Sequence, residues 1–214
     1  MTRGRFITLE GIEGSGKTTQ AAILADALRS RGNQVLVTRE PGGTHAGEFI
    51  RAIFLDRSIA LGETAELLLV LADRAQHVRE KLRPSLETGQ IVISDRYSDS
   101  TIAYQGYGRG LDLKLVRGLN RIASDSVTPD LTIVLDCSPE IGLARTKARA
   151  KSTARIRDRF EAEQLEFHRR VRDGFRVIAR DEPARVVLLD SSREPGDVSG
   201  DILRLVVERF FGQR

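Results

Sequence analysis

Five short apolar runs alternate with longer segments whose apolar residues recur at helical spacing. The runs are Arg5–Leu9, Gln34–Thr38, Ile91–Ser94, Leu131–Asp136 and Val186–Asp190. The segments of helical character are Thr18–Arg31, His45–Asp56, Thr64–Glu87, Leu113–Ala123, Pro139–Arg149, Arg159–Arg180 and Val198–Phe211. Apolar strands separated by helices indicate a parallel sheet covered on both faces. We therefore expect an α/β fold of three layers around five parallel strands.

The chain of 214 residues has the composition of a soluble globular protein, with 40% hydrophobic and 30% charged residues. Its length predicts one domain, residues 1–214. No apolar run approaches the roughly 18 residues that a membrane span needs, and Phe6–Leu9 comes too early to follow a signal peptide. The single cysteine, Cys137, excludes an intramolecular disulfide and is expected to be a packed core thiol. These features predict a cytoplasmic protein without a membrane partner.

Residues 11–18 match the phosphate-binding pattern G-x-x-x-x-G-K-[ST] at every fixed position, between a predicted strand and a predicted helix. Such a loop turns backbone N–H groups toward an anion at the positive end of a helix. Lys17 would reach the β- and γ-phosphates, and the Thr18 hydroxyl would ligate Mg²⁺. The chain lacks an Asn-Lys-x-Asp guanine motif, which disfavours a Ras-like GTPase. The expected ATP-binding residues are Gly11, Glu13, Gly14, Ser15, Gly16, Lys17, Thr18 and Thr19.

Charged side chains follow two further strands of the predicted sheet. Arg39 and Arg96 would project over the same strand ends as the phosphate-binding loop. Asp95, one residue past an apolar strand, stands where a carboxylate would hold Mg²⁺ or its waters. Arg51 and Arg74, on predicted helices, would complete a ring of arginines around this edge of the sheet. Because the guanidinium fork matches phosphate oxygens, arginines that converge here predict a second, phosphorylated substrate.

Positive charge is concentrated in one segment. The net charge is +4, yet residues 145–159 hold seven basic side chains and one acid, so the rest of the chain carries −2. A local basic run without aromatic residues weakens a nucleic-acid interpretation, since base stacking is poorly supplied. Two interpretations of the run stay open: a solvated helix face, or a lid that supplies an arginine to phosphoryl transfer.

A set of motifs in the chain resembles the bacterial thymidylate kinase family. It comprises Gly11–Thr18, Arg39–Thr44, Asp73-Arg74, Asp95–Tyr97 and Asp99–Gly106, and Asp158–Glu161 is similar to the segment that ends the family's lid. The resemblance implies the P-loop nucleoside monophosphate kinase fold, a lid at residues 145–160, and a homodimer. It also implies transfer of the γ-phosphoryl group of Mg-ATP to dTMP, which gives dTDP and ADP in dTTP synthesis, with no nucleic-acid partner.

The resemblance also assigns roles to single positions. Glu13 resembles an acidic residue near the acceptor's sugar and phosphate, which explains a carboxylate inside an anion-binding loop; a solvent-facing side chain is the alternative. Tyr104 resembles the aromatic residue that crowds the sugar C2′ and disfavours ribonucleotides. The expected dTMP-phosphate ligands are Arg39, Arg51 and Arg96. Pro41 and Ser100 are also expected to bind the substrate. The peptide bond before Pro41 is often cis in the family. The expected thymine-edge ligands are Arg74 and Thr101, with Gln105 close to the base.

The transition-state arginine has to come from outside the phosphate-binding loop, because positions 12–15 hold no basic residue. Within the basic run Arg149 matches the family best, and Arg155 and Arg157 remain candidates. Arg145 resembles an arginine near the adenine, although an ion pair at a lid hinge would look the same. The expected catalytic set is therefore Lys17, Asp95, Arg96 and Arg149, with Thr18 and Asp95 at the metal.

Position 70 departs from the family pattern. Phe is common one helical turn before Arg74, where it stacks on thymine, and this chain has Val70. Both positions share a helix face, so Val70 should still line the pocket and bind the base more weakly.

Two other functions are weighed against dTMP phosphorylation: a kinase for another nucleoside monophosphate, and a P-loop module that binds RNA or DNA. The three histidines, His45, His77 and His168, lack metal-ligand spacing and are expected on the surface or on helix faces.

Overall fold

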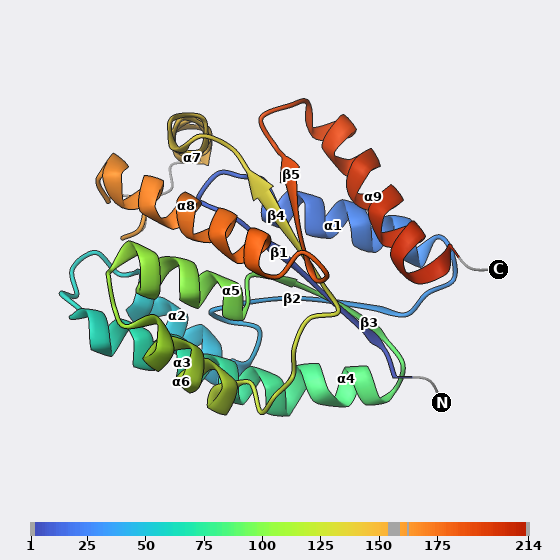
Figure 1. Cartoon of the computed structure of the whole chain (residues 1–214), viewed down its shortest axis with the longest axis horizontal. Coiled ribbons are helices and arrows are strands. Elements are labelled where there is room, and N and C mark those ends of the chain that lie inside the picture. Colours follow the sequence, from blue (N-terminus) through green and yellow to red (C-terminus); the bar gives the residue numbers. More distant parts are fainter. Residues whose placement is uncertain (1–2, 154–158, 162, 213–214) are drawn as a thin grey trace.

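The structure is a computed structural model that describes residues 3–153, 159–161 and 163–212. Its centre is a parallel sheet with strand order β2-β3-β1-β4-β5 (Figure 1). In the register of the sheet, Ile7 lies beside Ile93 on one side and Leu131 on the other. The five expected strands are confirmed, as β1 (Arg5–Glu10), β2 (Val35–Arg39), β3 (Ile91–Asp95), β4 (Leu131–Asp136) and β5 (Val186–Asp190).

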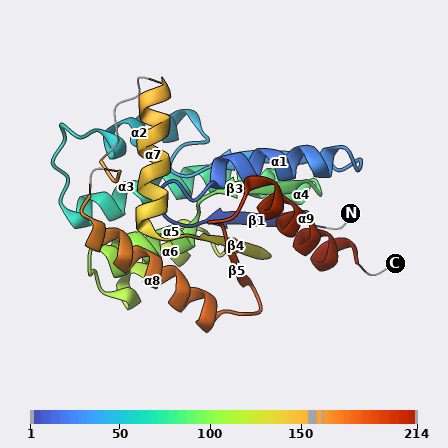
Figure 2. The ribbon, with the colours of Figure 1, turned by 90° about the horizontal axis from the view of Figure 1, so that it is seen from above.

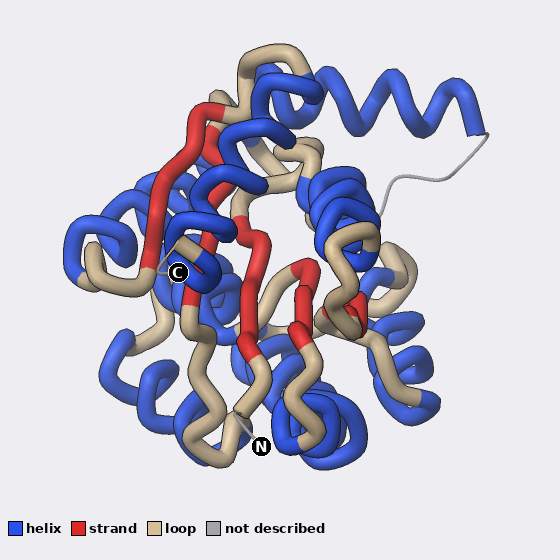
Figure 3. Tube along the Cα trace, turned by 90° about the vertical axis from the view of Figure 1, so that its right-hand side faces the viewer, coloured by secondary structure: helices blue, strands red, loops and turns tan. Residues whose placement is uncertain are grey.

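Helices cover both faces of the sheet, as Figures 1 and 3 show. Helices α1 (Lys17–Arg29) and α9 (Pro195–Phe211) pack on the face that carries Ile7, Ile93 and Ile133. Because successive side chains of a strand point to opposite faces, Phe6 and Val92 enter a separate cluster on the other face. The expected three-layer α/β fold is confirmed.

The other helices follow in chain order and place the loops that matter below. Seen from above, α7 crosses the end of the molecule at which the strands terminate (Figure 2). Within the described ranges, each helix is too short or too polar to cross a bilayer. These elements are α2 (His45–Leu55), α3 (Glu63–His77), the π-helical turn η1 (Val78–Leu82), α4 (Arg83–Glu87), α5 (Ser98–Thr101), the π-helical turn η2 (Ile102–Gly108), α6 (Leu113–Ala123), α7 (Pro139–Thr153) and α8 (Leu165–Asp181).

Two helical segments differ from the sequence-based expectation. The stretch predicted as Thr64–Glu87 is divided by η1, because Pro84 has no N–H to donate and its ring crowds the preceding turn. The helical turns at 98–108 were not predicted, since this buried segment has no amphipathic period to reveal them.

The helix expected to start at Arg159 starts at Leu165 instead. Residues 159–161 form a turn in which the Arg159 N–H donates to the carbonyl oxygen of Leu55, with N···O 3.2 Å. The Phe160 ring lies 5.1 Å from that of Phe54 and 6.4 Å from that of Phe167. A tertiary contact, rather than the helical period, therefore brings Phe160 into the apolar core.

Candidate active site

The phosphate-binding loop connects β1 to α1. Gly14 has a φ of 73°, and a Cβ at this position would lie 2.0 Å from the carbonyl oxygen of Gly142, so only glycine fits. The Lys17 ammonium donates to the carbonyl oxygens of Gly11 (3.0 Å) and Ile12 (2.8 Å), both in the loop. Burial and the neighbouring Arg96 lower the pKa of Lys17 to about 8. The lysine side chain is thus folded over the loop, where phosphate oxygens would replace the carbonyl partners.

The candidate metal ligands meet at the start of α1. The Thr18 hydroxyl donates to a carboxylate oxygen of Asp95 at the end of β3, with O···O 2.5 Å. β3 and β1 are neighbouring parallel strands, which brings the loop and Asp95 to the same edge. The structure therefore brings together the two oxygen ligands that the sequence predicted.

Glu13 lies inside the site rather than in solvent. Its Oε1 accepts a hydrogen bond from Arg96 (2.8 Å) and from the Tyr104 hydroxyl (2.6 Å). Its Oε2 lies 3.3 Å from Nδ1 of His168, a fully buried histidine. Burial alone would raise the pKa of Glu13, but Arg96, the His168 hydrogen bond and Lys17 hold it well below its usual range.

Arg96 bridges the phosphate-binding loop and α5. Besides Glu13, its guanidinium donates to the carbonyl oxygen of Gly11 and to the Ser100 hydroxyl, each at 3.0 Å. Its φ of 74° is unusual for a residue with a side chain and is typical of functional sites. The face of Tyr104 lies 4.7 Å from this guanidinium. Arg96 is therefore held rigidly against the loop that carries Lys17.

The loop after β2 carries the other expected phosphate ligands. The Glu40–Pro41 peptide is cis, the isomer common in the resembled family. Arg51 donates to the carbonyl oxygen of Pro41 at 2.8 Å, and Arg39 pairs with Glu48 at 2.9 Å. Both arginines border the cavity described below.

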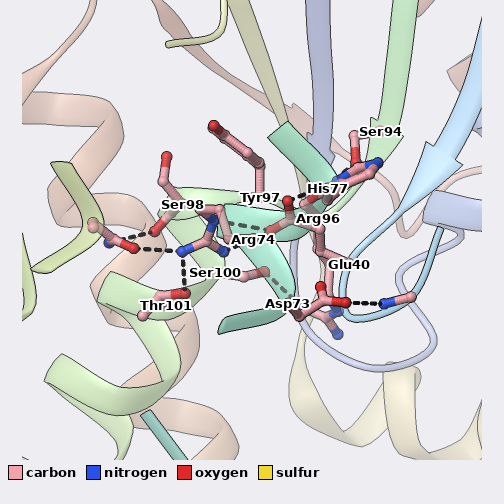
Figure 4. Close-up of polar contacts among 12 residues, drawn as sticks. Glu40, Asp73, Arg74, His77, Ser94, Arg96, Tyr97, Ser98, Ser100 and Thr101 are labelled. Atoms are coloured by element: carbon pink, nitrogen blue, oxygen red, sulfur yellow. Dashed lines mark hydrogen bonds and ion pairs between the residues drawn. The ribbon is translucent and has the colours of Figure 1, made fainter. Parts of the chain in front are cut away.

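Arg74 is buried in a polar network, with 2% of its surface exposed (Figure 4). Its Nε and Nη2 pair with Glu40 at 2.9 Å and 2.8 Å, and its Nη1 donates to the Thr101 hydroxyl at 3.0 Å and to Asn120. His77 contacts the other oxygen of Glu40 at 2.8 Å. The guanidinium that the resemblance places at the thymine edge is thus fixed by α3, α5, α6 and the loop after β2.

One cavity of about 220 Å³ joins the two groups of cations. Lys17 lies on its wall together with Arg39 and Arg96, as the spacing of the motifs predicted. Of the expected site residues, Gly11, Ser15 and Arg145 do not reach the wall. The expected residues that do are Glu13, Gly14, Gly16, Lys17, Thr18, Thr19, Arg39, Pro41, Arg51, Val70, Arg74, Asp95, Arg96, Ser100, Thr101, Tyr104, Gln105 and Arg149.

The basic segment is described only in part. Arg149, on α7, borders the cavity and pairs with Glu161 at 3.1 Å. Arg145 donates to the carbonyl oxygens of Ser191 (2.8 Å) and Ser192 (3.2 Å), so it positions the loop after β5. Arg155 and Arg157, the other lid candidates, lie outside the described residues.

Several residues of the site were missed or misplaced from the sequence. His77 and His168 lie on faces of α3 and α8, one of the two positions expected, but both faces are buried and neither histidine is on the surface. Glu10 is also fully buried, and burial and Asp99 raise its pKa well above the usual value. None of these residues belongs to a spaced motif that would single it out, because each acquires its partners only in the folded chain. Cys137 is buried, as predicted.

A P-loop and a second cluster of cations on one cavity, at the carboxyl ends of parallel strands, define the class of P-loop nucleoside monophosphate kinases. The family model described as thymidylate kinase matches residues 9–202. The thymidylate kinase of Solidesulfovibrio magneticus is 53% identical over 197 residues, which cover 91% of this chain and 94% of that protein. That of Trichlorobacter lovleyi is 48% identical over 207 residues, covering 96% and 98%.

A solved structure agrees with these relatives. The crystal structure of thymidylate kinase from Ehrlichia chaffeensis superposes with a TM-score of 0.76 at 36% sequence identity, covering 95% of this chain and 99% of that one. The chain belongs to the thymidylate kinase family.

Proposed function

We propose that the chain transfers a phosphoryl group from ATP, held by the loop of residues 11–19, to dTMP, held by Arg39, Arg51 and Arg96. Members of the thymidylate kinase family are phosphotransferases that convert dTMP to dTDP, and this activity belongs to the chain through its membership. The observation that supports the residue roles is the shared cavity, in which Lys17 lies on one wall and the three arginines lie on the others.

To catalyse the transfer, the protein has to position the two substrates and neutralise their negative charge. A phosphate monoester is largely dianionic at neutral pH, since its second pKa is about 6, and therefore needs little general-base help. Donor and acceptor bring many negative charges together, which Lys17 and Arg96 would offset at close range. Arg145 would act at the adenine end through the loop after β5.

Mg²⁺ is the metal that the oxygen donors of the site suit. Thr18 and Asp95 already contact each other at the phosphate-binding loop, and carboxylate, hydroxyl and phosphate oxygens are its preferred ligands. Such an ion would enter with ATP and keep several of its waters. When bound at Thr18 and Asp95, it would neutralise charge on the phosphate oxygens.

The acceptor nucleoside would occupy the part of the cavity between α3 and η2. Tyr104 would lie against the sugar, with Glu13 beside it and Pro41 and Ser100 near the phosphate. Val70, Arg74, Thr101 and Gln105 would contact the base. The shared wall that these side chains form supports this placement.

Arg149 is assigned the transition-state charge. Arg149→Ala should lower kcat by about 10³ or more and change the KM for dTMP much less, because such an arginine acts on charge that develops during transfer. Lys147→Ala removes an exposed cation from the same helix and serves as the control. Steady-state kinetics decide, and an unchanged kcat in Arg149→Ala would remove this residue from the mechanism.

Residues 1–214 would act as one P-loop kinase domain, in which residues 145–160 form the lid, in the cytoplasm. The length and composition of the chain support the single domain and the cytoplasmic location, and the cluster of basic residues at 145–159 supports the lid.

A homodimer through α2 and α3 is part of the proposal. Phe49 and Leu68 on these packed helices are 63% and 55% exposed, an unusual exposure for large apolar residues that a partner would cover. Phe49→Glu should convert the dimer to a monomer in sedimentation equilibrium. Ile23→Glu on α1 is the matched control on another face and should leave the dimer intact.

An ADP-release assay with Mg-ATP and dTMP, dUMP, UMP, dCMP and AMP tests the whole assignment. The expected result is the highest kcat/KM with dTMP. A chain that releases no ADP with any acceptor, and binds RNA or DNA with steep salt dependence, would instead be a nucleic-acid module.

A further inference from the structure

A buried carboxylate stands behind the wall of the acceptor cavity. Glu66 of α3 is 1% exposed, and its Oε1 accepts a hydrogen bond from Nε2 of Gln105 at 2.7 Å. Its Oε2 lies 3.1 Å from Arg109 and 3.0 Å from Arg159, both through Nη2. Gln105 itself lies on the cavity wall. Glu66 therefore reaches the cavity lining directly through the amide of Gln105, and indirectly through Arg159, whose guanidinium lies 4.9 Å from the Phe160 ring.

The chemistry of the pair determines how the amide of Gln105 is turned. A carboxylate can only accept hydrogen bonds, whereas an amide has two N–H donors and one oxygen acceptor. The NH₂ end of Gln105 therefore faces Glu66, and Oε1 is directed elsewhere. Within the described part of the chain, this Oε1 makes no hydrogen bond, so an acceptor atom is left for a ligand of the cavity.

A neighbouring side chain supplies the complementary donor. The Thr101 hydroxyl oxygen accepts a hydrogen bond from Nη1 of Arg74 at 3.0 Å, as Figure 4 shows. Because its oxygen is occupied by that donor, the Thr101 proton is available to the cavity. The wall thus offers a hydroxyl donor from Thr101 and an amide acceptor from Gln105, which suits the N–H and C=O of an imide.

We propose that Glu66 is a positioning residue for base selection: it orients Gln105 so that Oε1 accepts the N3–H of thymine. Cytosine has an unprotonated N3, which would meet this oxygen lone pair to lone pair and leave both groups unpaired. Glu66 thereby disfavours dCMP without touching either substrate. This inference rests on the proposed function, in which the base lies beside Gln105.

The test compares the kcat/KM ratio of dTMP to dCMP in Glu66→Gln with that in the wild type. An amide at position 66 can both donate and accept, so Gln105 is free to turn either end toward the base. We expect the ratio to fall by at least about tenfold, the scale of one hydrogen bond to a ligand. The KM for ATP should stay unchanged, whereas a general loss of structure would change it.

Glu163→Gln is the matched control. Glu163 pairs with the same Arg109, at 2.6 Å, whereas the hydrogen bond of the Gln105 amide is to Glu66, so the variant removes an equal charge without freeing the amide. Its dTMP-to-dCMP ratio should remain within about twofold of the wild type, since rim charges contribute little. A tenfold fall in this control as well would assign the effect to Arg109 and overturn the proposal.

The exchange Glu66→Gln/Gln105→Glu provides the rescue. It keeps one carboxylate and one amide in contact, and the carboxylate at position 105 can only accept from the base. The ratio should return toward the wild-type value. A folded Glu66→Gln enzyme with the wild-type ratio overturns the inference. If Glu66→Gln does not fold, a folded exchange variant that shows no preference for dTMP over dCMP overturns it instead. Wild-type protein inactive on dTMP would instead refute the proposed function.

Discussion

Glu13 is a negatively charged residue in a loop that binds anions, and its hydrogen-bond partners stabilise it there. A carboxylate in an anion-binding loop repels phosphate, yet here it accepts hydrogen bonds from Arg96 and Tyr104. In this structure the Arg96 guanidinium is neutralised by Glu13 at 2.8 Å. A bound acceptor phosphate would therefore share Arg96 with Glu13, which keeps the arginine aimed at the cavity between turnovers.

Val70→Phe should strengthen dTMP binding. Val70 is 7% exposed and borders the cavity on the same helix face as Arg74, so an aromatic ring at this position would reach the base. The expected gain is about 0.5–1.5 kcal/mol, the value of an aromatic contact beyond its buried area. Isothermal titration calorimetry measures it, with Ile23→Phe on the exposed side of α1 as control. An unchanged affinity would show that position 70 does not face the base.

Helix α3 contributes two residues to the wall of the cavity and supports two further parts of it. Val70 and Arg74 lie on the cavity, and Glu66 stands behind Gln105. Asp73, which is fully buried, accepts a hydrogen bond from the N–H of Gly42 at 2.9 Å and so ties the loop after β2 to the helix (Figure 4). One helix thus positions both the loop after β2 and the side chains proposed to contact the base.

Asp73→Asn should remove part of the pH dependence of stability. Burial and the nearby Glu40 raise the pKa of Asp73 from 3.8 to about 7. Between these values the folded chain holds this proton more tightly than the unfolded chain, so the free energy of unfolding falls as pH rises. The loss across this window is on the order of 2–4 kcal/mol, given the 1.36 kcal/mol of one pKa unit.

Urea unfolding at pH 5 and pH 8 measures this effect. The amide that replaces the carboxyl group in Asp73→Asn is neutral at both pH values and keeps an oxygen that accepts from Gly42. The variant should therefore lose less stability than the wild type between them. Asp26→Asn, which removes an exposed carboxylate of α1, controls for the change in net charge. Parallel pH profiles for Asp73→Asn and the wild type would contradict the assignment.

At the scale of the whole molecule, a buried polar network connects the sheet to the helical segment beside it. Asp99 of α5 is 1% exposed and accepts from Arg185 at 2.7 Å and 2.9 Å. The Thr132 hydroxyl of β4 donates to the same carboxylate at 3.0 Å, and Thr8 of β1 contacts Thr132 at 2.8 Å. The network connects the sheet to the segment that carries Ser100 and Thr101.

Asp99→Ala should lower the free energy of unfolding by about 1–3 kcal/mol, because it removes the buried acceptor of Arg185 and Thr132, while Arg185 keeps its ion pair with Glu182 at 2.9 Å. Asp181→Ala breaks the exposed pair with Arg180 and should cost less than about 1 kcal/mol. Chemical denaturation of the two variants gives the comparison. Equal losses would mean that Arg185 is solvated in the folded chain.

Prediction from the sequence succeeded where signals are local. The strand runs, the loop from Gly11 to Lys17 and the arginines after β2 and β3 lie in short patterns whose meaning depends on neighbours in the chain. It did not identify the surroundings of His168 and Phe160, which come from segments far away in the chain. The cavity contacts of single side chains and the start of α8 belong to this second group.

The layered sheet, the phosphate-binding loop and the edge at which the cations gather can all be predicted from the amino-acid sequence, since backbone geometry and apolar periodicity act over a few residues. The partners of the buried polar groups become known from the folded chain: Glu13 with Arg96, Asp73 with Gly42, Glu66 with Gln105. The physical reason is that a buried donor or acceptor must be paired with whatever group packing brings within about 3 Å, and packing depends on the entire chain.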